Sequence, residues 1–270
     1  MTRLYYMNRY SYARLVFGYF LILVLYKIQA TEYLFSLKGA PLKGHDVDYA
    51  YLIFLATGIP QFIISHTWTC VLFDCGTLIL LLACLFSDKY RHWFARFFIL
   101  FFFTQRLTLE IYANSHTKSI SCLLFAFLPF CFKDEDIFEL LVGFGRYFLL
   151  FILISAAYHK LTNGALLTSG NFVNQLINQH TDLAILQPTH ISYKVAHYLI
   201  LHPVLANFLF KLLWVAQLTF IAGIFTKQYD RYLWIILMAF AVSTYFIMRI
   251  YNFDITVLGC SLWFYKTIKN

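Results

Sequence analysis

Charged side chains are scarce in this sequence. Asp, Glu, Lys and Arg make up 13% of the 270 residues, whereas a soluble domain carries about 25%. So few charges cannot cover a water-facing surface, and 61% of the residues are hydrophobic. The scarcity excludes an ordinary soluble domain and predicts a polytopic membrane protein in contact with the lipid bilayer. Since no segment longer than roughly 45 residues is polar enough to fold separately, we interpret residues 1–270 as one membrane domain.

Several motifs of soluble enzymes and binding proteins are also missing. The chain has no G-x-S-x-G, H-E-x-x-H or P-loop pattern, which leaves ordinary hydrolases and NTPases without support. Its six cysteines form no C-x-x-C pair and lie in apolar stretches, so we expect buried free thiols and no metal site. The net charge of +8 comes without a basic run interleaved with aromatic residues, and we expect no nucleic-acid partner.

What the sequence does contain is a series of apolar segments along its whole length. A spanning helix needs about 20 apolar residues, or about 17 at the short end. We therefore predict an all-α transmembrane bundle of about eight spans plus interfacial helices. The predicted spans are residues 11–29, 67–86, 93–112, 118–132, 138–160, 205–225, 231–251 and 253–266. Residues 50–65 are also apolar, but Gly58-Ile59-Pro60 interrupts them, and we interpret them as an interfacial or re-entrant helix.

The distribution of Lys and Arg supports this number of spans. With the N-terminus inside, the inner face holds Arg3, Arg9, Arg14, Lys89, Arg91, Arg96, Lys133, Lys227, Arg231, Lys266 and Lys269. The outer face holds the smaller set, Lys38, Lys43, Lys118, Lys160 and Lys194. This asymmetry follows the positive-inside rule and predicts an integral protein of a bacterial cytoplasmic membrane. The long polar segment 161–204 then lies on the outer face, where we expect amphipathic helices.

Charged residues inside apolar segments are costly in a membrane and mark candidate functional positions. These candidates are Asp74, Arg106, Glu110, Arg146, Lys160, Lys211, Arg249 and Asp254. Arg106 and Glu110 lie four residues apart on one predicted helix, where they can pair. Such a pair either orients helices or takes part in function.

Lys160 is the most informative of these residues, because it ends a nearly uncharged span and follows Tyr158 and His159. It can snorkel to water, or it can be a desolvated amine that acts as a base. His116 lies in a short loop that the topology places on the same outer face. It is either a hydrogen-bonded capping residue or a second group in the chemistry.

Several motifs, in this order along the chain, resemble a known family. They are residues 12–18 with 37–41, Asn114-Ser115-His116, the run from Arg146 to Lys160-Leu161 followed by Gly170, residues 221–231 and residues 252–257. Together they resemble the horizontally transferred transmembrane (HTTM) domain family, which includes the membrane part of vitamin K-dependent gamma-carboxylase. Gln217 stands where this family often has an acidic residue.

The resemblance implies a specific chemistry. Lys160 would deprotonate a reduced quinone, a vitamin K-like hydroquinone, and His116 would assist at the later carbanion and carbon dioxide step. Further polar residues would contact substrate or support the site: Asn114, Arg146, His159, Arg106 and Glu110. The protein would then be a truncated carboxylase-like lyase or oxidoreductase acting at the outer face.

Two other functions stay open at this point. One is a non-catalytic membrane partner or maturation factor for an exported peptide, which would not depend on Lys160. The other is a small transporter, although the chain lacks the inverted repeats typical of that class. Whether the protein is an enzyme therefore depends largely on Lys160.

Overall fold

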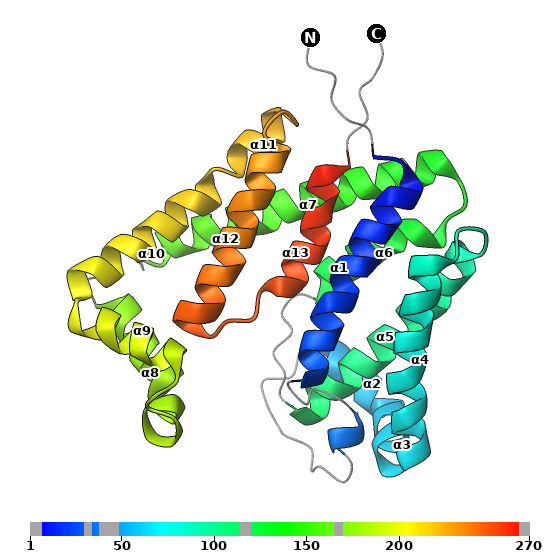
Figure 1. Ribbon diagram of the computed structural model, residues 1–270, viewed down its shortest axis with the longest axis horizontal. Helices are drawn as coiled ribbons and strands as arrows, with labels where there is room; N and C mark the ends of the chain where they lie inside the picture. Colours follow the sequence, from blue (N-terminus) through cyan, green and yellow to red (C-terminus); the bar gives the residue numbers. More distant parts are fainter. Residues whose placement is uncertain (1–6, 30–33, 38–48, 114–119, 165–169, 265–270) are drawn as a thin grey trace. The chain divides into compact units, whose positions relative to one another are not determined.

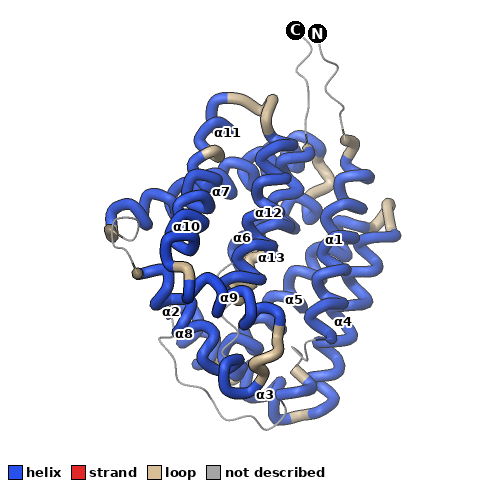
Figure 2. Tube along the Cα trace, turned by 60° about the vertical axis from the view of Figure 1, so that its left-hand side comes forward, coloured by secondary structure: helices blue, strands red, loops and turns tan. Residues whose placement is uncertain are grey.

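The computed structural model describes residues 7–29, 34–37, 49–113, 120–164 and 170–264. Within these ranges every regular element is a helix and no strand occurs (Figure 1; Figure 2). This confirms the all-α class. The chain divides into two compact units, residues 5–143 and residues 144–270 with residues 1–4. The single membrane domain predicted from the sequence stays a prediction.

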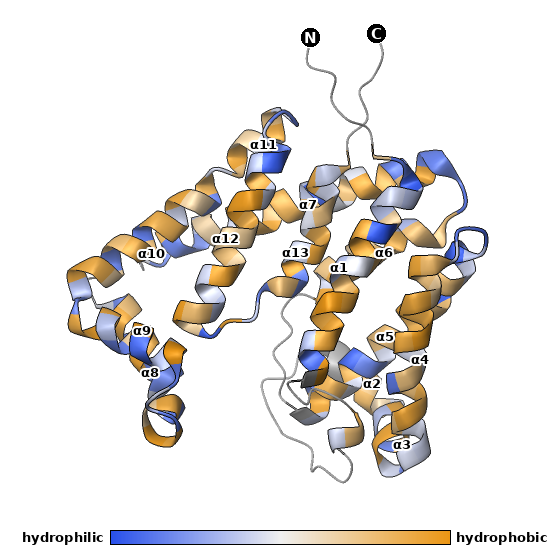
Figure 3. Ribbon diagram, viewed as in Figure 1, coloured by the Kyte–Doolittle hydropathy of each residue, from blue (hydrophilic) through white to orange (hydrophobic). Residues whose placement is uncertain are grey.

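Five helical segments are long and apolar enough to cross a membrane. They are Arg9–Ile28, Thr67–Phe86, Glu135–Thr162, Pro203–Phe225 and Asp230–Met248. Apolar residues dominate these segments, whereas polar residues gather at helix ends and connecting loops (Figure 3). Because such helices bury their backbone hydrogen bonds within themselves, they can lie in lipid. The chain is therefore an integral membrane protein.

The other predicted spans are not confirmed as spans. Helix α5 (Arg91–Ala113) has 23 residues, but it carries Arg91, Arg96, Arg106 and Glu110. Helix α6 (Ile120–Phe127) and the 3-10 helix η2 (Leu128–Cys131) form one short segment, and α13 (Phe253–Gly259) with η3 (Cys260–Trp263) forms another. A straight α-helix rises about 1.5 Å per residue, so neither short segment alone reaches across a hydrocarbon core of about 30 Å.

The first unit begins with α1 (Arg9–Gln29), followed by η1 (Phe35–Leu37), α2 (Tyr49–Ala56), α3 (Ile59–Ser65) and α4 (Thr67–Phe86). The predicted break inside residues 50–65 is confirmed. Gly58 adopts a left-handed conformation with φ 73° between α2 and α3, and Pro60 lies in the first turn of α3. Glycine tolerates that φ and proline suits a first helical turn. The position of the two helices relative to the membrane stays a prediction.

Three contacts bring the basic ends of this unit together. Arg9 pairs with Glu135 at the start of α7 (Glu135–Thr162) at 3.3 Å. Arg14 lies 3.5 Å from Asp88 in the α4–α5 connection, and Arg96 Nε donates to the backbone oxygen of η2. The start of α1, the α4–α5 connection and the α6–α7 connection therefore share one end of the unit, as the charge distribution predicts. Since α1 leaves this end and α4 returns to it, α2 and α3 make no net crossing between them.

Aromatic side chains form the core of this unit. Phe127 of α6 contacts Phe17 and Phe20 of α1 and Phe98 of α5, with ring centroids 4.9–5.5 Å apart. All four rings are buried. Aromatic pairs of this kind add roughly 0.5–1.5 kcal/mol beyond the area they bury. Part of the chain's 20% aromatic content therefore packs α1, α5 and α6 together.

The second unit contains most of α7 and the helices that follow it. These are α8 (Asn171–Leu186), α9 (Ile191–Leu201), α10 (Pro203–Leu218), α11 (Ile221–Phe225), α12 (Asp230–Met248) and α13 with η3. The helices predicted within 161–204 are confirmed as α8 and α9. Helix α8 buries Phe172, Leu176, His180 and Leu183, a spacing that places them on one face. Phe172 and Leu176 pack with Leu199, Ala206 and Met248 in one cluster.

Candidate functional site

The side chain of Lys160 turns toward the protein instead of projecting freely into solvent. Its residue lies in the last turn of α7, and its Nζ donates a 2.7 Å hydrogen bond to Oε1 of Gln217 on α10. Gln217 is only 3% exposed. An amine that snorkels would instead extend to the membrane surface. The geometry therefore favours the second sequence interpretation, an amine held in a partly desolvated position.

Aromatic rings form the surroundings of this amine. The Nζ atom lies 5.8 Å from the ring centroids of both Phe210 on α10 and Phe240 on α12. Among the described residues, none of the ion pairs involves Lys160. The partner of the amine is thus a neutral amide, which stabilises an ammonium group less than a carboxylate would. We call Lys160, Gln217, Phe210 and Phe240 the lysine site.

A second contact fixes α7 against α10 near the lysine site. The indole Nε1 of Trp214 donates to the backbone oxygen of Ala157 at 2.9 Å. Trp214 and Gln217 lie three residues apart on α10, and Ala157 and Lys160 lie three apart on α7. Residues three apart share a helix face, so the two hydrogen bonds connect the same pair of faces. This arrangement restricts where the lysine amine can move.

His159 does not join the lysine site. Its Nε2 lies 2.8 Å from Nδ2 of Asn163, and both side chains are exposed. This hydrogen bond joins two side chains four residues apart at the end of α7. This contact is local, and a contact of His159 with substrate stays a prediction.

Arg146 forms a buried ion pair with Asp230. Its Nε and Nη2 each donate to a different carboxylate oxygen of Asp230 at 2.7 Å, and Nη2 also donates to the backbone oxygen of Gly223 at 2.6 Å. The two side chains are 3% and 2% exposed. A bidentate arginine–carboxylate pair of this kind is strong and directional, and it joins α7, α11 and α12. Sequence reasoning identified Arg146 but missed Asp230, although a buried arginine in an apolar segment requires a counter-charge.

Arg106 and Glu110 belong to the other unit, on α5. Arg106 is 4% exposed, lies over the ring of Phe102 at 5.8 Å and lines a cavity of about 560 Å³ between α1, η1, α4 and α5. The ion pair between Arg106 and Glu110 stays a prediction. Asp74, another intramembrane candidate, accepts a 2.6 Å hydrogen bond from Gln105 and lines the same cavity.

The remaining predicted residues are placed in different ways. Asn114 and His116 lie outside the described residues, so their approach to Lys160 stays a prediction. Arg249 at the end of α12 pairs with Asp182 of α8 at 2.5 Å, and Lys211 is exposed on α10. Five of the six free cysteines are buried as expected, but Cys75 is exposed because it lies where α4 borders the cavity. Within the described ranges, no three His, Cys, Asp or Glu residues are grouped as a metal site.

His180 is the most buried histidine of segment 161–204. It is 1% exposed, and its Nδ1 lies 3.0 Å from the backbone oxygen of Leu176. Burial lowers its pKa below the ordinary 6.5, an effect that the hydrogen bond to Leu176 partly offsets and that the nearby Arg249 increases. The imidazole is therefore neutral near pH 7, with Nδ1 as the donor.

The chain was compared with family models, with curated proteins and with solved structures, and none of them matches it. Membership of the HTTM family is therefore a proposal that rests on the motifs in the sequence.

Proposed function

We propose that this protein is a membrane-embedded enzyme of the HTTM type, resembling gamma-carboxylase, with Lys160 as its base. In this proposal α5 crosses the membrane, and so does each of the two short helical segments together with the residues that flank it, which gives about eight crossings with the N-terminus inside a bacterial cytoplasmic membrane. The lysine site then faces the outer side. The observation that carries the proposal is the Lys160 amine, which is hydrogen-bonded to the neutral Gln217 and flanked by two aromatic rings.

The chemistry of the lysine site suits a base. An amine accepts a proton only when it is neutral, and a low-dielectric site without a carboxylate partner favours that form. The rings of Phe210 and Phe240 provide apolar, flat surfaces, which fit a flat aromatic group. A reduced quinone, when bound, would supply an acidic ring hydroxyl. Gln217 would hold the amine in place while Lys160 accepts the proton at Nζ.

The test is oxygen-dependent oxidation of vitamin K hydroquinone by the purified protein in lipid nanodiscs. We expect Lys160→Ala and Lys160→Arg to lower the rate by roughly 10²- to 10⁴-fold, the usual contribution of a general base. Lys160→Arg keeps the positive charge, but a guanidinium group stays protonated and cannot accept a proton. The matched control is Lys211→Ala on the exposed side of α10, which should leave the rate unchanged. Full activity of Lys160→Ala, with normal membrane accumulation, would exclude the proposal.

The alternative is a non-catalytic membrane partner or maturation factor for an exported peptide. One observation favours it: only 17% of the α10–α11 segment is buried inside the protein. Phe208, Leu212 and Val215 form an exposed apolar stripe there, which would contact either lipid or another membrane helix. Capture of one stable membrane partner that is lost in Phe208→Ala and retained in Lys160→Ala would support this function.

A further inference from the structure

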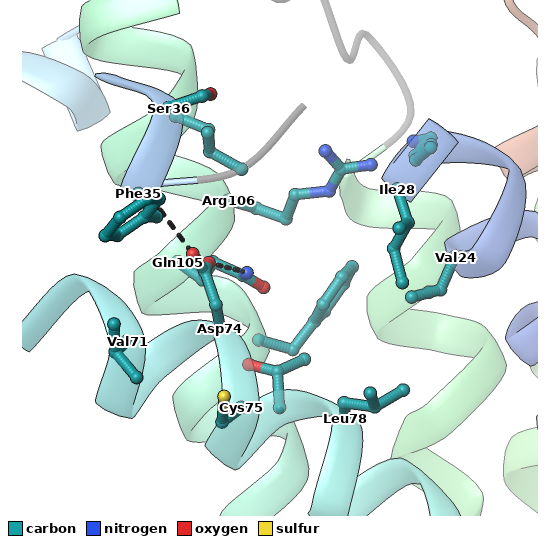
Figure 4. Close-up of a pocket in the computed structure, with 14 residues that line it drawn as sticks. Val24, Ile28, Phe35, Ser36, Val71, Asp74, Cys75, Leu78, Gln105 and Arg106 are labelled. Atoms are coloured by element: carbon teal, nitrogen blue, oxygen red, sulfur yellow. Dashed lines mark hydrogen bonds between the residues drawn. The ribbon is translucent and has the colours of Figure 1, made fainter. Parts of the chain in front are cut away.

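The cavity in the first unit has the size of a small-molecule site. Its volume of about 560 Å³ falls within the roughly 300–1,000 Å³ typical of ligand pockets. It is lined by residues of α1, η1, α4 and α5. In Figure 4, Val24 and Ile28 of α1 lie on one side, Val71 of α4 lies on the other, and Leu78 closes the lower end. Most of the wall is therefore apolar.

Polar groups are confined to a few positions in this wall. The carboxylate of Asp74 accepts hydrogen bonds from Gln105 Nε2 at 2.6 Å and from the backbone nitrogen of Phe35 at 3.1 Å (Figure 4). Two cationic side chains, Lys27 and Arg106, also line the cavity and are at most 6% exposed. The lining thus has two positive side chains and one carboxylate. The carboxylate of Asp74 accepts its hydrogen bonds from the neutral groups of Gln105 and Phe35.

One further polar residue of the lining has a hydroxyl without a hydrogen-bond partner among the described residues. Thr77 is 4% exposed and lines the cavity, yet its Oγ1 has no hydrogen-bond partner among the described residues. A buried hydroxyl without a partner costs roughly 1–3 kcal/mol. A threonine in a helix can usually satisfy its hydroxyl on the preceding turn, as Thr108 does on α5. Because Thr77 Oγ1 is itself buried, it lies behind the surface of the cavity.

We propose that this cavity binds a single-chain acidic lipid, with its hydrocarbon chain along α1 and α4 and its acidic head at Arg106 and Lys27. A negatively charged head is attracted to these two positive side chains. Arginine holds a carboxylate or a phosphate through paired N–H donors. The apolar wall takes the chain, and the volume suits one chain more closely than the two of a phospholipid. This site is independent of the proposed role of Lys160.

The test measures equilibrium binding of oleate to the full-length protein in nanodiscs of zwitterionic lipid. Methyl oleate is the neutral probe, and lysophosphatidate is the phosphate-headed probe. We expect oleate to bind at least about tenfold more tightly than methyl oleate, and Arg106→Gln to weaken oleate by roughly 10- to 100-fold. Arg106→Lys should restore most of the affinity, because it keeps the charge. Tighter binding of lysophosphatidate than of oleate would identify a phosphate head and leave the acidic-lipid class intact.

Two further variants locate the bound lipid. Leu78→Trp projects a larger side chain into the cavity and should weaken oleate binding by at least about tenfold. Ile79→Trp introduces a tryptophan one residue away, on a side chain that is 64% exposed. Cys75 adds a native probe, because it is the one exposed cysteine of the six and lines the cavity. Oleate should slow its labelling by N-ethylmaleimide in the wild type and not in Leu78→Trp.

Several outcomes would overturn the proposal. The protein could bind oleate and methyl oleate with equal affinity, or Leu78→Trp and Ile79→Trp could weaken oleate binding equally. Absence of binding of both acidic probes would also overturn it. Arg106→Gln can fail to fold, since it removes a buried charge. Circular dichroism checks for this, and the Leu78→Trp comparison, which leaves every charge in place, decides the question in that case. None of these readouts depends on hydroquinone oxidation, so the two proposals can fail separately.

Discussion

The buried pair of Arg146 and Asp230 gives the sharpest prediction about stability. Arg146 makes two 2.7 Å hydrogen bonds to the carboxylate and one 2.6 Å bond to the Gly223 backbone oxygen. Asp230→Asn preserves the shape of the side chain but leaves the guanidinium charge buried beside a neutral amide. Removing one partner of a buried ion pair costs about 3–5 kcal/mol. We expect a loss of that size in the free energy of unfolding.

The assay is unfolding by sodium dodecyl sulfate in bicelles, followed by circular dichroism. The double variant Arg146→Met/Asp230→Leu removes both charges and should be less destabilised than Asp230→Asn by about 1–4 kcal/mol. The exposed pair of Arg249 and Asp182 provides a matched control. Its side chains are 37% and 56% exposed, so Asp182→Asn should cost at most about 1 kcal/mol. The reasoning is refuted if Asp230→Asn costs no more free energy of unfolding than Asp182→Asn. It is also refuted if the double variant loses as much stability as the single variants Arg146→Met and Asp230→Leu lose in sum.

Two further predictions concern a glycine and a histidine. A Cβ atom on Gly223 would lie 2.8 Å from Leu233 and 2.9 Å from Leu150, and both leucines are buried. Gly223→Ala should therefore lower the free energy of unfolding by roughly 1–3 kcal/mol. Gly143→Ala is the control, because its Cβ would meet nothing within 4 Å, and it should be neutral or stabilising in the same unfolding assay. Burial lowers the pKa of His180 below 6.5 in the folded state. As the pH falls, the unfolded segment therefore binds the proton before the folded one does. The stability of α8 should be at its full value above about pH 6.5 and decrease below it. Hydrogen exchange of the α8 amides at about pH 7.5 and about pH 5 measures this, and persistence of the pH effect in His180→Leu would contradict it.

Helix positions were readily predictable because hydropathy records directly which segments can lie in lipid. Residues 67–86 were predicted as a span, and α4 covers Thr67–Phe86. The start of α7 was placed three residues late, at 138 instead of Glu135. The backbone nitrogens of Asp136 and Ile137 are capped by the Asp134 side chain, and this capping signal is visible in the sequence. Polar caps therefore refine what hydropathy locates only approximately.

Breaks inside apolar segments were harder to predict. Residues 118–132 were predicted as one span, but α6 ends at Phe127 and Pro129 lies in the 3-10 helix that follows. Proline has no backbone N–H for the preceding turn, so the helix tightens there. Residues 205–225 likewise divide into α10 and α11 at Thr219 and Phe220. A hydropathy average does not register such breaks, and tertiary packing decides where they occur.

The partners of the buried polar residues could not be predicted from local sequence. Arg146 and Asp230 are 84 positions apart, and Lys160 and Gln217 are 57 apart. Periodicity places each residue on a helix face, but the choice of the facing helix depends on the packing of the whole unit. The sequence showed only that Gln217 replaces the acidic residue common in the family. Its contact with Lys160 shows the consequence, which is that the amine has a neutral partner instead of a carboxylate.

The two polar contacts of α7 act on the same helix and have different consequences. Arg146 and Lys160 are 14 residues apart, so about 21 Å of helix separates an ionic attachment to α12 from a neutral attachment to α10. The ionic pair restrains α7, and through it the position of the Lys160 amine. Loss of activity in an Arg146 variant would therefore not identify Arg146 as a substrate ligand, because displacement of Lys160 would give the same result. Asp230→Asn separates the two cases because it leaves Arg146 in place. If the activity of this variant falls in proportion to its free energy of unfolding, Arg146 acts by positioning Lys160.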